Sequence, residues 1–535
     1  MKRVLIILLG LSLVGHAVAN ESLDDPAEVS IGERLFLETR FAQAYYAKPG
    51  KADPVMDKTV MATTSLKGPF AGQTMNCRAC HLVDEFAEHS DGGLRTYADY
   101  AMQSPIPSRN DGNDMTGRNS MSLVNIAVPM KDGHVFHFDG EFNTMEDLVM
   151  GTLTGRNYGW KTTEYNVAIK HIANIIRNDD GKGKLANEFG GSYAKIFEGS
   201  DKSIPLKFRL PNEYRVDVSK ANDVQIVTAA TKLIAVYVTG LTFSQDEAGV
   251  YNGSPYDAFL KRNNLPRQPS TDESFASYSQ RLLLAVNKLE RPDFVTGKKE
   301  SFKTHKQQFI FGEKELNGMK LFFTKGNKVQ SGGNCISCHS APHFSDYKFH
   351  NTGLTQHNYD KTHGKHAFNK LNIPNIEKRN GDYDAYLPST VKHPHASSRF
   401  RHSVKTDKPG FVDLGLWNVF ANPDMPVPQK KLKNMLCEQV REEGSNNCQD
   451  DDLLRQSIAS FKTPVLRDLG HTAPYMHTGQ FNELKNVVDF YISSSAMSRN
   501  NKVRNGDKKL NNIYISPKDS ASLVAFIRSL NEDYD

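Results

Sequence analysis

The apolar positions of this chain recur mostly at helical spacing. In the stretches 223–240, 275–290 and 518–531, apolar side chains lie three and four residues apart, as one buried helix face requires. No series of segments alternates between apolar and polar residues in the manner of successive strands. The pattern therefore predicts a mainly α protein, with helices joined by irregular loops.

Two kinds of segment occur twice. FDGEFNTMEDLV at 138–149 and HTGQFNELKNVV at 477–488 share G-x-F-N and continue with apolar residues at helical spacing. The sequences IGERLF at 31–36 and NGMKLF at 317–322 are likewise similar. The pairs indicate a diverged tandem duplication.

The first residues form a different pattern. Lys2 and Arg3 precede an apolar run that is too short to span a bilayer, and Ala17-Val18-Ala19 follows it. This order of charged, apolar and small residues is typical of a secretory signal peptide. We expect segment 1–19 to be removed after Ala19, the protein to be periplasmic, and no part of it to cross a membrane.

Length and charge narrow the possibilities further. The chain has 535 residues, which is longer than the length that a single hydrophobic core usually supports. Together with the duplication, this length predicts two domains, at 20–265 and 266–535. An insert near 157–222 carries no interpretable motif, and we expect either a surface elaboration or a role in access to the first domain's site. Loss of Lys2 and Arg3 reduces the formal net charge from +5 to +3, which is too small to indicate nucleic-acid binding.

Four of the six cysteines lie in CRACH at 77–81 and CISCH at 335–339. Covalent c-type haem attachment uses two thiols at this spacing and the histidine that follows as an iron ligand. Structural zinc and a thioredoxin-like pair are the alternatives, but each CxxC has its own adjoining histidine and export disfavours both. We expect two haems, and the residues predicted to hold them are Cys77, Cys80, His81, Cys335, Cys338 and His339.

The other two cysteines, Cys437 and Cys448, flank a short loop. In an exported chain they are candidates for a local disulfide, with two unpaired thiols as the alternative.

The repeat also compares the distal sides of the two haems. Tyr491 follows Gly479 by the same interval as Thr152 follows Gly140. If both positions face their haems, the second haem has a potential ligand and the first has an open position. An ordinary core aromatic on an amphipathic helix is the alternative for Tyr491.

These residues together resemble the bacterial di-haem cytochrome c peroxidase and MauG superfamily. The resemblance covers most of the exported chain, in the order GERLF, CRACH, GRNSMSLVN, FDGEFNTMEDLV, SPYDAFL, CISCHSAPHFSD, FHNTGL, DLGLWNVF and FKTPVLRDLGHTAPYMHTGQF. It implies two tandem cytochrome c-like domains, each with one covalent haem, and haems near the domain interface. The first haem would be peroxidatic and the second would transfer electrons.

The resemblance also implies particular ligands. The distal ligand of the second iron stands fourteen residues after the histidine of the PYxH motif in this family; counted from His477, that position is Tyr491. The tyrosine is the choice of MauG-type members, with Met497 and Met476 as alternatives. A calcium ion between the domains would be held by Asn119, Thr472 and Pro474, whose oxygen atoms suit this cation.

Three departures concern the first haem. Phe138 replaces the family's bridging tryptophan, Leu148 and Thr152 replace its distal glutamine and proline, and the catalytic glutamate falls at Tyr158. Cleavage of peroxide needs a group that moves a proton between its oxygens. Glu164, Glu146 and Tyr158 are the candidates, and each is also readable as an ordinary structural residue.

Three functions follow as hypotheses. The leading one is a periplasmic peroxidase that reduces hydrogen peroxide with electrons from a small c-type cytochrome or cupredoxin. The alternative is a MauG-like oxidase that acts on a partner protein. Tyr491 favours this alternative, and so does the lack of a distal histidine at the first haem. His89 lies too near CRACH to serve as that histidine. An electron carrier without turnover is the third.

Overall fold

The computed structural model describes residues 25–49, 76–77, 80–81, 103–106, 109–111, 115–128, 134–297, 302, 307–442 and 444–532. The predicted signal peptide and His89 lie outside these residues, as do Arg78 and Ala79 of the first CxxCH motif. Among the described residues, no helix is both long and apolar enough to cross a membrane.

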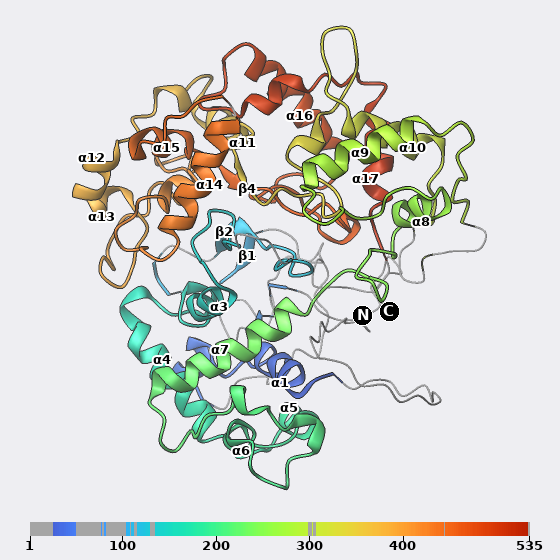
Figure 1. Cartoon of the computed structure of the whole chain (residues 1–535). Helices are drawn as coiled ribbons and strands as arrows, with labels where there is room; N and C mark the ends of the chain where they lie inside the picture. Colours follow the sequence, from blue (N-terminus) through green and yellow to red (C-terminus); the bar gives the residue numbers. More distant parts are fainter. Residues whose placement is uncertain are drawn as a thin grey trace, which may run out of the picture.

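The described chain is mainly helical, as the apolar spacing predicts (Figure 1). Two small antiparallel sheets pair β1 (Gln103–Pro105) with β2 (Met115–Asn119), and β3 (Phe349–His350) with β4 (Phe461–Lys462). The three long predicted helices are present as α7, α9 and α17. The α-helices are α1 (Ala27–Phe36), α2 (Gln43–Ala47), α3 (Met145–Leu153), α4 (Tyr165–Arg177), α5 (Lys184–Glu188), α6 (Tyr193–Glu198), α7 (Asp223–Thr239), α8 (Pro255–Arg262), α9 (Phe275–Asn287), α10 (Glu313–Phe323), α11 (Leu354–His363), α12 (Ile376–Gly381), α13 (Tyr383–Tyr386), α14 (Gln429–Glu442), α15 (Asp450–Gln456), α16 (Leu484–Arg499) and α17 (Ser520–Arg528).

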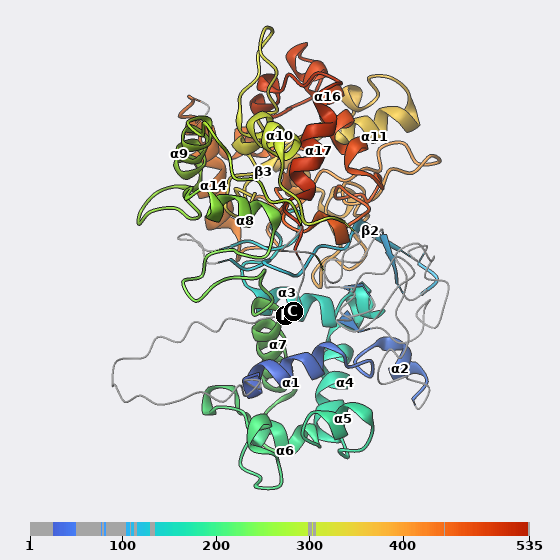
Figure 2. The same cartoon turned by 90° about the vertical axis from the view of Figure 1, so that its right-hand side faces the viewer.

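Buried apolar side chains form three clusters. The first surrounds α1, α3, α4 and α7, in the lower half of Figures 1 and 2. The second joins α8, α9, α10 and α17 with the start of α16, and the third lies around α11, α14 and α15. Both of these occupy the upper half of the molecule. The domain boundary near residue 265 stays a prediction.

The duplicated helix openings make the same kind of contact. A Cβ atom on Gly32 of α1 would lie 2.3 Å from the carbonyl oxygen of Leu233 in α7. A Cβ atom on Gly318 of α10 would lie 1.9 Å from the carbonyl oxygen of Ser522 in α17. Each repeat therefore uses a glycine to let two helix backbones approach closely.

The G-x-F-N segments also share their local structure. Phe136 donates its backbone N–H to Phe142 at 2.7 Å, and Tyr475 donates to Phe481 at 2.7 Å. Each turn contains a glycine at positive φ, and a helix follows: α3 in the first case and α16 in the second. Thr152 and Tyr491 therefore occupy corresponding positions on these helices.

The insert near 157–222 is a packed part of the first core. Its helices α4 and α6 contribute buried apolar residues to that cluster, including Ile172 and Phe197. Arg34 of α1 forms a fully buried ion pair with Asp179 at 3.0 Å and lies 3.7 Å from the ring of Tyr193. The insert is therefore part of the first core and not a surface elaboration. It supplies buried apolar side chains, and its Asp179 pairs with the buried charge of Arg34, which would be costly to leave unpaired.

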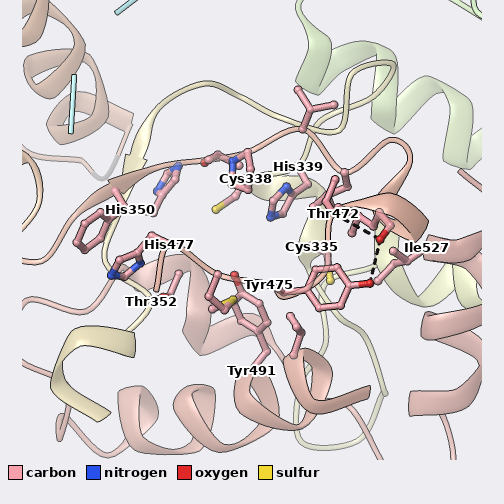
Figure 3. A pocket seen from close by; sticks show the side chains of 18 of the residues that line it. Cys335, Cys338, His339, His350, Thr352, Thr472, Tyr475, His477, Tyr491 and Ile527 are labelled. Atoms are coloured by element: carbon pink, nitrogen blue, oxygen red, sulfur yellow. Dashed lines mark hydrogen bonds between the residues drawn. The ribbon is translucent and has the colours of Figure 1, made fainter. Parts of the chain in front are cut away.

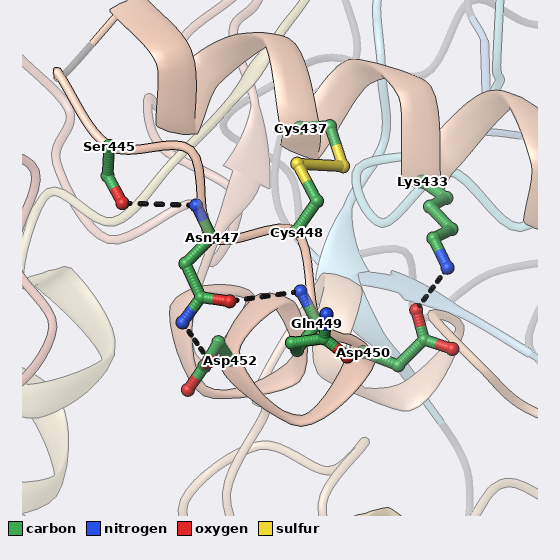
Figure 4. Close-up of a disulfide and its surroundings, with 8 residues drawn as sticks. All are labelled: Lys433, Cys437, Ser445, Asn447, Cys448, Gln449, Asp450 and Asp452. Carbon is green, nitrogen blue, oxygen red and sulfur yellow. Dashed lines mark hydrogen bonds and ion pairs between the residues drawn. A yellow bond between two sulfur atoms is a disulfide. The ribbon is translucent and has the colours of Figure 1, made fainter.

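Cys437 and Cys448 form the expected local disulfide (Figure 4). Their Cα atoms are 5.4 Å apart, and the bond ties α14 to the segment that leads into α15. Beside it, Asn447 accepts a hydrogen bond from the backbone of Gln449.

Candidate functional site

The two CxxCH motifs fold into the same turn. In the first, the backbone N–H groups of Cys80 and His81 both donate to the carbonyl of Cys77, at 3.1 and 2.9 Å. In the second, Cys338 and His339 donate to the carbonyl of Cys335, at 3.2 and 2.8 Å. This turn places both thiols and the histidine of each motif on one short piece of chain.

The second motif lines a large, mainly apolar pocket (Figure 3). Cys335, Cys338 and His339 lie along one side, and Tyr491 extends from α16 on the other. The Nδ1 atom of His339 is 2.9 Å from the carbonyl oxygen of Phe344, which it can reach as a donor. Metal-ligating histidines commonly use one ring nitrogen in this way, so Nε2 is available as an iron ligand.

The pocket keeps its reactive groups uncharged. Burial raises the pKa of Cys335 to about 12 and lowers the pKa of His339. Burial, together with the nearby Cys338 and Cys335 thiols, raises the pKa of Tyr491 above its usual range. A neutral imidazole is the form that can ligate iron, and the Cys335 thiol stays protonated until it is used for a thioether bond.

The pocket also distinguishes the alternatives for the distal ligand. Tyr491 and Met476 both line it, whereas Met497 is not among the lining residues of the described chain. Met476 lies in the turn before α16, at a φ of 74°. The structure thus brings Tyr491 and Met476, but not Met497, to the same space as His339.

His350, within the FHNTGL motif, is a pocket residue that sequence reasoning did not single out. Its Nε2 lies 2.9 Å from a carboxylate oxygen of Asp346, and its Nδ1 lies 2.5 Å from Asp507. Although burial alone lowers it, the pKa of His350 is raised well above its usual value by Cys338 and Asp346. Lys509 also lines the pocket, with its Nζ 3.7 Å from a carboxylate oxygen of Asp346, so two cations and two carboxylates lie together at this edge.

The first motif is buried against the N-terminal core. Cys77 and Cys80 pack on that cluster, and the Tyr158 hydroxyl lies 3.3 Å from the Cys77 sulfur. Burial raises the pKa of Cys77 to about 12 and lowers that of His81 to about 4. The Nδ1 atom of His81 is buried and has no hydrogen-bond partner among the described residues. A neutral imidazole and paired thiols fit a second haem here.

The acid-base candidates have different surroundings. Glu164 forms an ion pair with Arg109 at 2.6 Å, and a hydrogen bond with Arg109 lowers its pKa. Tyr158 is buried beside Cys77, and burial raises its pKa well above the usual value. Glu146 is exposed in the first turn of α3. Glu164 and Tyr158 form their hydrogen bonds with Arg109 and Cys77, and a catalytic role for any of the three candidates stays a prediction.

Phe138 reaches the second pocket from the N-terminal half. It lines the pocket, and its ring centroid is 6.4 Å from that of His477. The His477 ring in turn stacks on Phe461 at 3.6 Å. The backbone N–H of Lys462 donates to the Phe138 carbonyl at 2.8 Å. Phe138 therefore stands where segments from both halves meet, and its bridging role between two haems stays a prediction.

The predicted calcium residues lie together. The side-chain amide of Asn119 donates to the Pro474 carbonyl at 2.7 Å, and its backbone N–H donates to the His477 carbonyl at 2.8 Å. Thr472 lines the same pocket. The Asn119 side-chain oxygen is buried without a hydrogen-bond partner in the described chain. An unsatisfied buried oxygen next to backbone carbonyls fits a calcium ion.

Comparison with known proteins gives the site a context. No family model matches the chain. Cytochrome-c peroxidase IdrP1 of Pseudomonas sp. is 22% identical over 347 residues, which is 63% of this chain and 65% of the relative. Methylamine utilization protein MauG of Methylophilus methylotrophus is 39% identical over 72 residues, 14% of this chain and 20% of that protein.

The chain thus matches less than two thirds of the length of these curated relatives. The crystal structure of the diheme peroxidase BthA from Burkholderia thailandensis shares 15% identity, with 95% of this chain and 86% of that chain covered at a TM-score of 0.39. The sequence relatives confirm the resemblance to the di-haem cytochrome c peroxidase and MauG superfamily.

Proposed function

We propose that the chain is a periplasmic di-haem oxidoreductase that reduces hydrogen peroxide with electrons from a small c-type cytochrome or cupredoxin. The proposal includes removal of residues 1–19, and tandem cytochrome c-like domains at 20–265 and 266–535 with one covalent haem each. One observation supports it above the others: Cys335, Cys338, His339 and Tyr491 surround a single pocket.

The donor sets at both motifs fit haem. Paired thiols with an adjoining histidine are present twice, in the same backbone turn, and each histidine is half-buried with a lowered pKa. Haem iron supplies the electron-transfer and peroxide-activating chemistry when it is bound. The chain's own residues hold the ring, exclude water from its faces and set which face is open.

Tyr491 and Thr152 divide the two sites. Tyr491 occupies the pocket of the second motif opposite His339, which suits a closed site that receives and passes on electrons. Thr152 is its counterpart above His81 and has no comparable ligand atom, so the first site is the one at which peroxide binds. Phe138 lies between them and shortens the gap by filling it with an aromatic ring.

Proton transfer at the first site is assigned to Glu164 or Tyr158. Arg109 keeps Glu164 ionised, which is the form that can accept a proton, but by lowering its pKa it also makes Glu164 a weaker base. Tyr158 stays protonated beside Cys77 and is suited to donate a hydrogen bond. Calcium, held by Asn119 with Thr472 and Pro474, would tie together two segments that line the second pocket, one from each half of the sequence.

A MauG-like oxidase of a partner protein is the second candidate. It is supported by Tyr491 in the pocket and by the relative named MauG. An electron carrier without turnover would need a closed site at both motifs, and Thr152 argues against that.

Intact mass and turnover assays test the proposal. The purified protein should exceed the mass of its processed chain by two haems and should consume hydrogen peroxide while oxidising a reduced small cytochrome. One haem, or bound zinc, would defeat the di-haem assignment. Two haems with no peroxide consumption, but with peroxide-dependent oxidation of a protein, would favour the second candidate.

A further inference from the structure

One wall of the second pocket is formed by two short segments, 324–334 and 507–519. Gly333 and Asn334 of the first segment, and Lys509 and Leu510 of the second, line the pocket. Gly332 and Tyr514 exchange backbone hydrogen bonds at 2.8 Å in both directions, which joins the segments edge to edge. The same two segments also carry exposed residues, among them Lys328 and Lys518, so they extend from the pocket to the protein surface.

The outer side of this wall is basic. Lys325, Lys328, Lys508 and Lys518 are all exposed, and we call these four residues the basic rim. Val329 directly follows Lys328 and is 96% exposed, so an apolar side chain stands beside the lysines.

The acidic residues of these segments do not offset the rim. Asp507 is turned inward to His350, and its side chain is 10% exposed. Asp519 is half-buried and accepts a hydrogen bond from the Ser331 hydroxyl at 2.7 Å. The surface of the wall is therefore dominated by lysine ammonium groups.

The sequence shows that this charge is local. Residues 324–334 hold two lysines and no acidic residue, and residues 507–519 hold three lysines and two aspartates, Asp507 and Asp519. These two segments carry a net charge of +3, which is more than half of the formal net charge of +5 of the whole chain. A general excess of lysine does not explain the rim.

We propose that the basic rim is the docking surface for the electron donor, and that this donor is a small redox protein with an acidic face. The inference rests on the proposed function and adds the charge of the partner. Complementary charge accelerates encounter by about 10- to 1,000-fold at low ionic strength. An exposed apolar residue inside a polar rim is a common centre for such a contact. Because residues of the same two segments line the pocket of Cys335, Cys338 and His339, a donor bound at the rim would lie next to this pocket.

Two forms of a single donor test the proposal. The probe is one small, lysine-rich cytochrome c, used in its native cationic form and after succinylation, which replaces its lysine charges with carboxylates. Stopped-flow absorbance measures the second-order rate of reduction of the haem-loaded full-length protein by each form, and calorimetry measures binding of each form independently of electron transfer. The test variant is Lys325→Glu with Lys328→Glu, and the control is Lys202→Glu, which changes an exposed lysine in the insert.

The anionic form should react at least ~10-fold faster with the wild type at low ionic strength, and salt should remove most of this advantage. The double variant should lose about 10-fold in rate and bind the anionic form more weakly, whereas Lys202→Glu should change either quantity less than ~2-fold.

Equal rates for the two forms, or no effect of the double variant, would overturn the inference. So would tight binding to phosphatidylglycerol vesicles without binding of the anionic cytochrome. If dithionite reduces both haems and peroxide reoxidises them, such a result leaves the proposed function standing. A protein that dithionite and peroxide do not affect would refute the proposed function as well.

Discussion

At the scale of single residues, Tyr491 decides the character of the second site. Its side chain lines a mainly apolar pocket, whose polar residues include those of the CxxCH motif and His350. Because burial raises its pKa, the phenol needs a strongly attractive partner to lose its proton, and ferric iron would supply one.

Replacing Tyr491 with Phe should therefore change the ferric absorption spectrum of the second haem, because the iron loses a ligand that water or Met476 then replaces. The matched control is Met476→Leu, which alters the same pocket and should leave the spectrum as it is. If Met476→Leu changes the spectrum and Tyr491→Phe does not, Met476 is the ligand instead.

Asn119 makes a second residue-scale prediction, through its unsatisfied side-chain oxygen. A chelator should lower the melting temperature of the wild type, since calcium that binds the folded state stabilises it. Asn119→Ala should be less stable from the start and should respond little to the chelator. A wild-type melting temperature that does not change on chelation, after verified removal of metal, would contradict the calcium assignment.

Asp413 predicts a pH dependence of stability. Burial raises its pKa, but Arg118, at 2.6 Å, outweighs burial and holds the pKa below its usual value. A carboxyl with a lowered folded pKa stabilises the protein above its unfolded pKa of about 3.9, and that stabilisation is lost as the pH falls further. The free energy of unfolding should therefore fall steeply below about pH 4. Asp413→Asn should flatten this decline in urea titrations, and the exposed Asp384→Asn should not.

At the scale of elements, the helix pairs α1 with α7 and α10 with α17 define each half. Gly318→Ala should destabilise the protein by about 1–3 kcal/mol, because the new methyl group meets the Ser522 carbonyl and the helices must separate. Gly381→Ala is the control, since a Cβ atom there meets nothing within 4 Å. Chemical denaturation measures both. Equal effects of the two substitutions would show that the close helix contact is unimportant.

Elements built from local patterns could be predicted from the sequence. The spacing of apolar residues indicated α7, α9 and α17, and the G-x-F-N repeat indicated matching turns before α3 and α16. The insert near 157–222 could not be read in the same way. Its place in the core depends on partners such as Arg34 and Asp179, which are far apart in the chain and carry no local pattern.

The same limit applies to the site. The thiols and histidines could be predicted from the CxxCH motifs, because covalent haem attachment requires this spacing. His350 is held by Asp507, 157 residues away, and Asn119 meets Pro474, 355 residues away. The FHNTGL motif contained His350, but nothing in its sequence neighbourhood pointed to a carboxylate on each ring nitrogen. Such pairings follow from the tertiary structure alone.

At the scale of the whole molecule, the two halves place unlike sites side by side. The second pocket is lined by residues from both halves of the sequence, among them Phe138 and Tyr491. The first motif packs on the N-terminal core, and His81 lies near Met121. Burial lowers the pKa of His81, and a hydrogen bond with the Met121 backbone partly offsets this lowering. Because Met121 also lines the second pocket, the two sites share a wall.

The shared wall leads to a prediction about division of labour. Replacing His339 should block electron delivery from the donor and leave peroxide binding largely intact, while replacing His81 should remove the response to peroxide. Mass spectrometry must first show that both haems are attached in each variant, since loss of a ligand can prevent maturation. A His81 variant that has both haems and reacts normally with peroxide would reverse the proposed order of the sites.

The central claim is that this chain uses two haem sites to reduce peroxide, and stopped-flow spectroscopy of the purified wild type tests it most directly. The fully reduced protein is mixed with hydrogen peroxide, and the absorbance of both haems is followed in time. Both haems should be oxidised together with consumption of one peroxide per two electrons, and a reduced small cytochrome should then restore the starting spectrum. Two attached haems that stay reduced in the presence of peroxide would contradict the account.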